Sequence, residues 1–411
     1  MTVSAYKNVL LTSNIRLTDT DGKSHRVIKL AGLFNALGFH VVIMVGKCTS
    51  ATVKRHYSVI ETKTDPKDTS LDNLLKKVVR HIRQLVTLLS VYMKILVYGM
   101  KYNIITSSSV SPPIDSLLAY MLSKFTKVPF IYDYDDPSPQ LIALFNRCSI
   151  NDPQVKLSLI SERMLIRNAS LVLTSSETLR DHIARDFGKI RRVYVYHNLP
   201  KIRDINICED KYRLRRKLGL NVKSFLISYL GNPQPYVRGI ETLVNCAVDF
   251  KDNEAVLFLI IGGGQWEEYY RTLVKRLDLV DRVSITGKKP RQNALEYLAA
   301  SDVSCIPYGV NPASVYHAPT KLFEAMALRV PLLCTRLPNF VGILGNNGIY
   351  FDGSHEDLTR KIRWCMVNLE QLDKTGSSLR SRFLRRFTWE KQHLHSKNVL
   401  RALLKLGNSS R

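Results

Sequence analysis

The chain has 411 residues, of which 45% are hydrophobic and 23% are charged; this composition is normal for a globular protein and argues against long disordered stretches. Its length suits two domains of about 200 residues each. The seven cysteines are scattered without a C-x-x-C pair, which argues against a disulfide framework or a zinc site. The first residues lack a basic stretch followed by an apolar run, so we expect a cytoplasmic protein without a signal peptide.

Basic residues outnumber acidic ones by 60 to 35, for a formal net charge of +25, and the excess is spread over both halves of the chain. The positive electrostatic field of such a protein favours binding of polyanions, whether nucleic acid, anionic lipid headgroups or phosphorylated substrates. A general basic bias that aids solubility is the alternative. We expect no nucleic-acid partner, because no recognised reading motif accompanies the charge.

Short apolar strands alternate with helical segments along the first half, as in parallel α/β layers. A strand at Val9–Leu11 is followed by a helix with Val27, Leu30, Ala31, Phe34 and Leu37 on one face, and then by a strand at Val41–Val45. Further strands are predicted at Ile104–Thr106, Phe130–Tyr132, Leu171–Thr174 and Val193–Tyr196.

Residues 71–97 depart from this alternation, because their apolar side chains recur with a helical period. The set is Leu71, Leu74, Leu75, Val78, Ile82, Leu85, Val86, Leu89, Met93 and Leu96, and Lys76, Lys77, Arg80 and Arg83 lie on the opposite face. The stretch is too short to span a bilayer and Lys94 interrupts it. Two interpretations stay open: a helix lying on an anionic membrane, or a helix packed on the core with a solvated basic face.

A second alternating series begins after the charged stretch Lys201–Lys223. Its strands are predicted at Phe225–Tyr229, Val256–Ile261, Val283–Thr286, Val303–Ile306 and Leu332–Cys334. We therefore expect one domain over residues 1–199 and another over residues 200–389. Two such doubly wound domains place a cleft between the carboxyl ends of their strands, where ligands bind.

The most informative stretch is P-T-K-L-F-E-A-M-A at Pro319–Ala327. It predicts a loop and a short helix whose amino end offers unpaired N–H groups to a phosphate. Lys321 adds a mobile positive charge there. One turn further, Glu324 can accept two hydrogen bonds from ribose hydroxyls, each contributing roughly 1.5–3 kcal/mol. A glutamate that merely caps the helix or stays solvated is the alternative.

The run P-T-K-L-F-E-A-M-A-L-R-V-P resembles the donor-site motif of the retaining glycosyltransferases of group 1, also called family 4. The resemblance implies a GT-B fold, with two Rossmann-like domains facing across a cleft, and a ribose-binding role for Glu324. Many members carry another glutamate eight residues earlier, where this chain has Tyr316. The backbone amides from His317 to Thr320 are expected to cradle the diphosphate.

Weaker matches follow in the family's order over roughly residues 8–395. Gly231, Asn232 and Arg238 resemble the glycine turn and basic residue that hold the donor diphosphate, although members often have arginine in place of Asn232 and lysine in place of Arg238. A plain turn and a solvated charge are the alternatives. Gly262–Gly264 resembles a glycine-rich turn after a strand.

Two further matches concern the base and the closing helix. In relatives, the backbone near Lys288 lies beside the nucleotide base. Phe387–Gln392 resembles the family's closing helix, so the helix at about 390–411 is expected to pack back on the first domain.

In the first domain, Ser111-Pro112-Pro113 and Asp133-Tyr134-Asp135-Asp136-Pro137 resemble a pattern of some bacterial and archaeal members. Asp133 and Asp136 match its acids and are expected to position the acceptor hydroxyl or accept its proton. A helix-capping turn is the alternative. Gly22, with Asp21 and Lys23, loosely matches the glycine-rich loop that approaches the donor.

Asp133-Tyr134-Asp135 also fits the D-x-D motif that binds manganese in single-domain glycosyltransferases. A second α/β domain has no place in that architecture, so we expect neither metal nor cofactor. Catalytic roles are predicted for Asp133, Asp136 and Lys321. Donor-binding roles are predicted for Glu324, Arg238, Asn232, Gly231, His317, Thr320, Lys288 and Gly22.

The sequence thus predicts a retaining, metal-independent transferase that moves a sugar from a nucleotide-diphosphate sugar to a hydroxyl acceptor in glycan or glycolipid biosynthesis. A lipid-linked saccharide is a candidate acceptor, and if residues 71–97 form the helix that lies on an anionic membrane, the protein would act at the cytoplasmic face of that membrane. The alternatives are a sugar-nucleotide epimerase of the same architecture and an inactive donor-binding protein, which Tyr316 makes credible.

Overall fold

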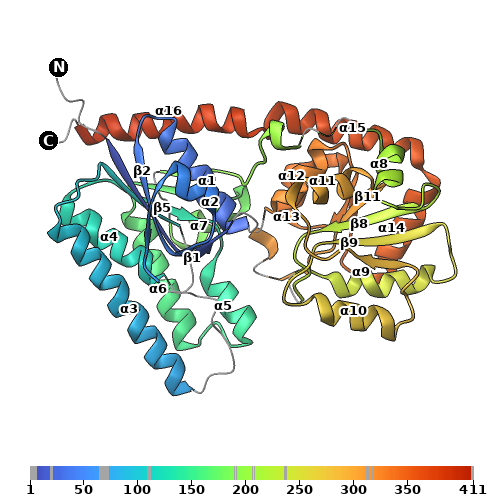
Figure 1. Ribbon diagram of the computed structural model, residues 1–411, viewed down its shortest axis with the longest axis horizontal. Helices are drawn as coiled ribbons and strands as arrows, with labels where there is room; N and C mark the ends of the chain where they lie inside the picture. Colours follow the sequence, from blue (N-terminus) through green and yellow to red (C-terminus); the bar gives the residue numbers. More distant parts are fainter. Residues whose placement is uncertain are drawn as a thin grey trace. The chain divides into compact units, whose positions relative to one another are not determined.

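The computed structural model describes residues 7–18, 22–63, 74–108, 113–188, 190, 192–205, 207, 209–235, 238–311, 314–316 and 318–408. The chain divides into two compact units: an N-terminal unit, Met1–His197 with His393–Arg411, and a C-terminal unit, Asn198–Gln392. Each unit is built around its own parallel sheet (Figure 1). The expected α/β architecture with two Rossmann-like parts is confirmed.

The N-terminal sheet has seven strands in the order β3-β2-β1-β4-β5-β6-β7, and all adjacent pairs are parallel. Its strands are β1 (Asn8–Leu17), β2 (His40–Cys48), β3 (Ser58–Glu61), β4 (Ile104–Ser108), β5 (Phe130–Tyr134), β6 (Leu171–Thr174) and β7 (Val193–Val195). The chain reverses its direction across the sheet between β1 and β4. At such a switch point the loops that follow the two strands diverge and leave room for a ligand.

The helices of this unit are α1 (Gly22–Asn35), α2 (Ala51–His56), α3 (Leu74–Val97), α4 (Ile114–Thr126), α5 (Ser138–Asn146), α6 (Pro153–Asn168), α7 (Glu177–Asp186) and the end of α16 (Trp389–Asn408). Because parallel crossovers are right-handed, α1 covers one face of the sheet, and α3, α4 and α6 cover the other. Leu400 and Leu403 of α16 are buried in the core that β1, β2 and α1 form, and Ser396 Oγ donates a hydrogen bond to the Tyr194 hydroxyl at 3.3 Å.

The C-terminal sheet has six parallel strands in the order β10-β9-β8-β11-β12-β13. They are β8 (Phe225–Leu230), β9 (Val256–Ile261), β10 (Val283–Ile285), β11 (Val303–Ile306), β12 (Leu332–Thr335) and β13 (Ile349–Phe351). The helices are α8 (Lys211–Lys217), α9 (Ile240–Cys246), α10 (Glu267–Arg276), α11 (Arg291–Ala299), α12 (Thr320–Ala327), α13 (Pro338–Leu344), α14 (His355–Val367) and α15 (Leu369–Arg386), and α16 starts here. Its central strands are buried on both faces, as parallel strands covered by helices require.

A buried ion pair fixes α8 to the centre of this sheet. Arg215 of α8 is 2% exposed, and its Nη2 lies 2.5 Å from Asp302 Oδ2. The same carboxylate oxygen accepts a hydrogen bond from the backbone N–H of Leu226 in β8 at 2.7 Å. Asp302, the residue before β11, therefore has a structural task in this unit.

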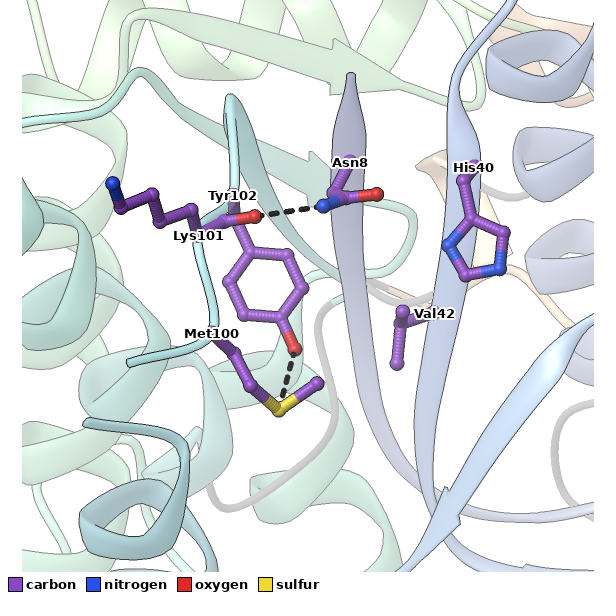
Figure 2. A pocket seen from close by; sticks show the side chains of 6 residues that line it. All are labelled: Asn8, His40, Val42, Met100, Lys101 and Tyr102. Carbon is purple, nitrogen blue, oxygen red and sulfur yellow. Dashed lines mark hydrogen bonds between the residues drawn. The ribbon is translucent and has the colours of Figure 1, made fainter. Parts of the chain in front are cut away.

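A hollow of about 470 Å³ opens at the amino ends of β1 and β2 in the N-terminal unit (Figure 2). Its lining consists of Asn8, His40, Val42, Met100, Lys101 and Tyr102. Asn8 Nδ2 donates to the carbonyl of Lys101 at 2.9 Å, and the Tyr102 hydroxyl donates to Met100 Sδ at 3.6 Å. Ligands of parallel α/β sheets bind at the opposite, carboxyl edge, and none of the predicted site residues lines this hollow.

Candidate functional site

Most of the predicted donor-binding residues lie near the carboxyl edge of the C-terminal sheet, whereas Gly22 belongs to the N-terminal unit. The chain changes its direction across this sheet between β8 and β11, which is where a doubly wound sheet binds ligands. Gly231 follows β8, Tyr308 lies two residues beyond β11, and α12 begins at Thr320. These three segments carry the site described below.

Two glycines allow the backbone to approach Lys321 closely. Gly231 has a φ of +126°, and a Cβ there would lie 2.7 Å from Lys321 Nζ. Gly262, after β9, has a φ of +150°, and its Cβ would lie 2.2 Å from the carbonyl oxygen of Gly231. Only glycine fits both positions, because any side chain would meet backbone or the lysine and would strain the backbone as well.

Lys321 is held by aromatic rings. Its Nζ lies 3.9 Å from the ring centroid of Tyr229 and 5.5 Å from that of Tyr308, within the range of a cation–π interaction. Within the described part of the chain, no carboxylate lies within ion-pair distance of this ammonium. Burial, reinforced by the charge of Arg238, lowers the pKa of Lys321 well below its usual value, and Glu324 opposes this shift. An anion bound here would favour the charged lysine.

Arg238 supplies a second cation beside the same tyrosine. Its Nη1 donates a hydrogen bond to the Tyr308 hydroxyl, and its Cζ lies 4.7 Å from the Tyr308 ring centroid. The repulsion between Arg238 and Lys321, visible in the lowered pKa of Lys321, shows that the two charges act on one region. Two cations that repel each other in a partly desolvated place suit a ligand with two negative groups.

Glu324 points its carboxylate toward α11. The residue is 4% exposed, and its Oε1 lies 2.6 Å from Arg291 Nη2. This contact lacks hydrogen-bond geometry, so the buried Oε1 accepts no hydrogen bond from any residue that the structure describes. The ion pair orients the carboxylate, while Oε1 keeps its capacity to accept a hydrogen bond from a hydroxyl group.

The other predicted donor-binding residues border this site. Asn232 is exposed, and its Oδ1 lies 3.1 Å from the position of a Cβ on Gly264. Thr320 is the half-buried first residue of α12. Lys288 is exposed, and its backbone nitrogen lies 2.8 Å from the position of a Cβ on Gly263. His317 lies outside the described residues, as do Asp21, Ser111 and Pro112.

In the N-terminal unit, Asp133 forms a buried ion pair at the end of β5. Arg26 Nε of α1 lies 2.9 Å from both carboxylate oxygens of Asp133, and the two side chains are 1% and 0% exposed. Ser108 Oγ, at the end of β4, donates to Asp133 Oδ2 at 2.9 Å. Arg26 Nη1 also donates to the carbonyl of Tyr196 at 2.8 Å. Asp133 thus joins α1 to the sheet.

The next two acids differ in environment. Asp135 Oδ1 lies 3.4 Å from Arg26 Nη1, yet burial dominates and raises the pKa of Asp135 to about 6. Asp136 Oδ2 lies 3.6 Å from Lys23 Nζ, and its side chain is 18% exposed. Gly22, the residue before Lys23, begins α1. Of the two predicted acids, Asp136 is the more accessible, and the catalytic roles of both stay predictions.

Several residues at these sites were not predicted from the sequence, among them Arg26, Arg291 and Tyr308. Arg26 stands four residues before Leu30, on the apolar side of its helix, and a charge in that position is a usable signal of a buried partner. Arg291 and Tyr308 gave no such signal, because each is brought to the site only by the order of the strands.

In the described part of the chain, no three histidine, cysteine, aspartate or glutamate side chains gather in a way that could hold a metal ion. The D-x-D stretch places Asp133 against Arg26 instead.

Comparison with known proteins finds a family match within the C-terminal unit. Residues 210–382 match the family model described as "Glycosyl transferases group 1", which confirms the resemblance seen in the sequence. TuaC of Bacillus subtilis, whose name proposes a glycosyltransferase of teichuronic acid biosynthesis, is 28% identical over 139 residues, which are 34% of this chain. The match spans only about a third of that relative's length, 32%.

The fold of the whole chain is shared with solved structures. Sucrose-phosphate synthase from Thermosynechococcus elongatus superposes with a TM-score of 0.77 at 18% identity, covering 97% of this chain and 100% of that one. HepE of Anabaena, solved in complex with UDP and glucose, gives a TM-score of 0.74 at 16% identity, covering 97% and 100%. At these identities the likeness shows the fold.

Proposed function

We propose, from the group 1 glycosyltransferase domain that residues 210–382 form, that this chain transfers a sugar from a nucleotide-diphosphate sugar to a hydroxyl acceptor in glycan or glycolipid biosynthesis. The observation that carries the proposal is the cluster of Lys321 and Arg238 over glycine backbone, with the buried carboxylate of Glu324 one turn further along α12. HepE, which shares the fold, was solved with UDP and with UDP-glucose.

The groups of this cluster would follow one another in the order of the diphosphate and the ribose of a nucleoside diphosphate. Lys321 and Arg238, with the free N–H groups at the start of α12, would bind the diphosphate. The ribose would then reach Glu324, whose Oε1 accepts no hydrogen bond from the described residues. The base would extend toward Lys288, after β10.

Catalysis in this proposal comes from stabilising the departing diphosphate. As the bond between sugar and phosphate breaks, negative charge grows on the phosphate oxygens, and the cations beside them already stand in place. Removing one such group typically lowers turnover by about 10²–10³. Two side-chain cations supply the charge that a metal supplies in other transferases, so we propose a metal-independent reaction. Retention of the anomeric configuration is proposed from the family resemblance.

The acceptor is proposed to bind the N-terminal unit. Asp136 is the accessible acid at the end of β5, and it is the better placed to position an acceptor hydroxyl. Asp133 is committed to Arg26 and would act by holding the loop in shape. A lipid-linked saccharide is the acceptor class that the excess of basic residues favours.

The test replaces Glu324 by alanine and measures UDP and UDP-glucose affinity by calorimetry. Losing the ribose hydrogen bonds should weaken binding roughly 10- to 100-fold, from about 1.5–3 kcal/mol for a hydrogen bond to a charged group. Glu370→Ala is the matched control, because Glu370 is an exposed glutamate of the same unit, 84% exposed in its side chain. Unchanged affinity in the Glu324→Ala variant would remove the assignment.

Tyr316 lies half-buried in a short 3-10 turn, Ser314–Tyr316. Because many relatives carry a glutamate at this position, an inactive donor-binding protein is the second candidate function. Donor binding without transfer or hydrolysis in a product assay would support that alternative. Conversion of the donor sugar in the absence of any acceptor would instead identify an epimerase.

A further inference from the structure

Helix α3 presents apolar side chains to solvent as well as to the core. Leu88, Tyr92 and Ile95 are buried at 2–4% exposure and face the sheet side. A second apolar set recurs every three or four residues on the outside, which places its members on one stripe. The stripe consists of Ile82, Val86, Leu89, Met93 and Val97, with exposures of 56%, 60%, 41%, 55% and 76%.

The two neighbouring helices extend this stripe into a surface. Helix α4 contacts both α3 and α6 (Figure 1). It exposes Met121 and Phe125 at 63% and 76%, and α6 exposes Leu157 and Ile160 at 67% and 66%. Large apolar side chains exposed together on adjoining elements mark an interaction surface. We call these exposed side chains of α3, α4 and α6 the outer apolar surface.

The exposed charges on the three helices have one sign. Helix α3 contains no acidic residue, and α4 and α6 contain one each, Asp115 and Glu162. Both acids are buried, at 4% and 0% exposure. The exposed charged side chains include Arg83, Lys94, Lys124 and Lys156. The surface therefore offers exposed cations and apolar groups, with no exposed carboxylate on the three helices.

We propose that the outer apolar surface docks on an anionic lipid bilayer. Apolar side chains on a basic helix enter the boundary between headgroups and acyl chains, while the cations meet anionic headgroups. No described helix is long and apolar enough to cross a membrane, and the contact proposed here lies along the membrane surface. A second copy of the chain would bring the same positive charges against these, so the charge pattern disfavours self-association.

The experiment measures flotation of the full chain with vesicles of phosphatidylcholine alone and of phosphatidylcholine with phosphatidylglycerol. The test variant is Val86→Asp with Met93→Asp, which removes two apolar groups of the stripe. The control is Val280→Asp with Val367→Asp, which makes the same change in charge at exposed valines of the C-terminal unit, 56% and 81% exposed. We expect the test variant to lose at least about tenfold more binding than the control, because each lost side chain would otherwise be buried in lipid.

A second variant addresses the charges. Arg83→Ala with Lys94→Ala and Lys124→Ala should weaken binding to the anionic vesicles by about fivefold per removed charge at low salt. Its binding should also depend less on salt than that of the unmodified protein. Far-UV circular dichroism of each variant checks the fold without relying on the proposed donor site.

Three results would overturn the proposal. One is absence of binding of the unmodified protein to anionic vesicles at low salt. Another is equal binding by the test variant and the control. The third is a dimer of the unmodified protein in light scattering that Val86→Asp with Met93→Asp dissociates, which would make this surface a contact between two copies. The proposal goes beyond sugar transfer, and UDP affinity of the same variants reports separately on the donor site.

Discussion

At the scale of single residues, Lys321 couples proton binding to ligand binding. In the free protein its pKa lies well below the usual value, because burial and Arg238 disfavour the charged form. A diphosphate beside Nζ would favour that form and raise the pKa again. Binding of UDP should therefore take up a proton above the lowered pKa, and UDP affinity should fall as pH rises through that range, by up to about tenfold per pH unit.

The measurement is calorimetry of UDP binding in buffers with different ionisation enthalpies, above pH ~7, where the terminal phosphate has lost its last proton. The Lys321→Met variant should bind more weakly and take up no proton. Equal proton uptake in both proteins would place the titrating group elsewhere.

The ion pair of Arg26 and Asp133 is a contact that the sequence alone did not predict. The motif around Asp133 was visible, but its partner stands 107 positions earlier, and the sequence offers no pattern that joins them. Breaking such a buried pair from one side usually costs about 3–5 kcal/mol, because the remaining charge stays buried. The sequence therefore does not distinguish a structural aspartate from an acceptor-binding one. The contact with Arg26 in the folded protein makes the distinction.

At the scale of elements, Glu162 links α6 to β5 and α5. Its Oε2 accepts a hydrogen bond from the Tyr134 hydroxyl at 3.0 Å, and its Oε1 accepts one from the backbone N–H of Ser138 at 3.1 Å. Burial raises the pKa of Glu162 to about 8, and the hydrogen bonds from Ser138 and Tyr134 oppose this shift. The folded protein therefore keeps a proton on this carboxyl group at neutral pH.

The raised pKa of Glu162 makes the stability of the protein depend on pH. Between the unfolded pKa of about 4.3 and the folded value of about 8, the folded state binds more protons. The stabilising contribution is therefore fully present below the unfolded pKa and is lost as pH rises through the folded pKa, with a slope of at most about 1.4 kcal/mol per pH unit. In urea unfolding at several pH values, Glu162→Gln should remove this part of the slope. Parallel curves for Glu162→Gln and the unmodified protein would contradict the assignment.

Several strands could be predicted because their apolar runs are bounded by turn residues. β6, β9 and β11 have the predicted limits, since each is a buried run between polar segments. β3 and β13 were missed. β3 has four residues, none of them fully buried, and β13 has three, of which only Phe351 is fully buried. Edge strands of this length carry too few apolar positions to show a pattern.

Helix α3 was predicted correctly as a helix, but the prediction did not identify which of its faces is buried and which is exposed. The periodic apolar set included Ile82, Val86 and Met93, which are exposed, whereas the core contacts come from Leu88, Tyr92 and Ile95. A helix with two apolar stripes shows the same period as a helix with one. Only the fold distinguishes the stripe that packs on the sheet from the stripe that faces outward.

At the scale of the whole molecule, the N-terminal unit depends on residues from both ends of the sequence. Leu400 and Leu403 of α16 are 2% and 5% exposed within a core that also holds Val9 and Val41. Replacing Leu400 by alanine should destabilise this unit by about 2–5 kcal/mol. Leu394→Ala is the control, because Leu394 lies on the same helix and is 65% exposed; such exposed substitutions usually change stability by about 0.5 kcal/mol or less.

Hydrogen exchange of the amides in β1 and β2 is the measurement that locates the effect. Faster exchange there in Leu400→Ala, with unchanged exchange in β8 and β9, is the expected outcome. Loss of protection confined to the C-terminal unit would contradict it.

The division of the chain within α16 has a consequence for biosynthesis. A ribosome makes β1 and α1 before the C-terminal unit, yet the leucines that close their core are translated about 390 residues after β1. The C-terminal unit, which is continuous in sequence, has all its parts earlier. Synthesis of the N-terminal unit therefore begins before that of the C-terminal unit and is completed after it, and until then the nascent core has an open side for a chaperone to cover.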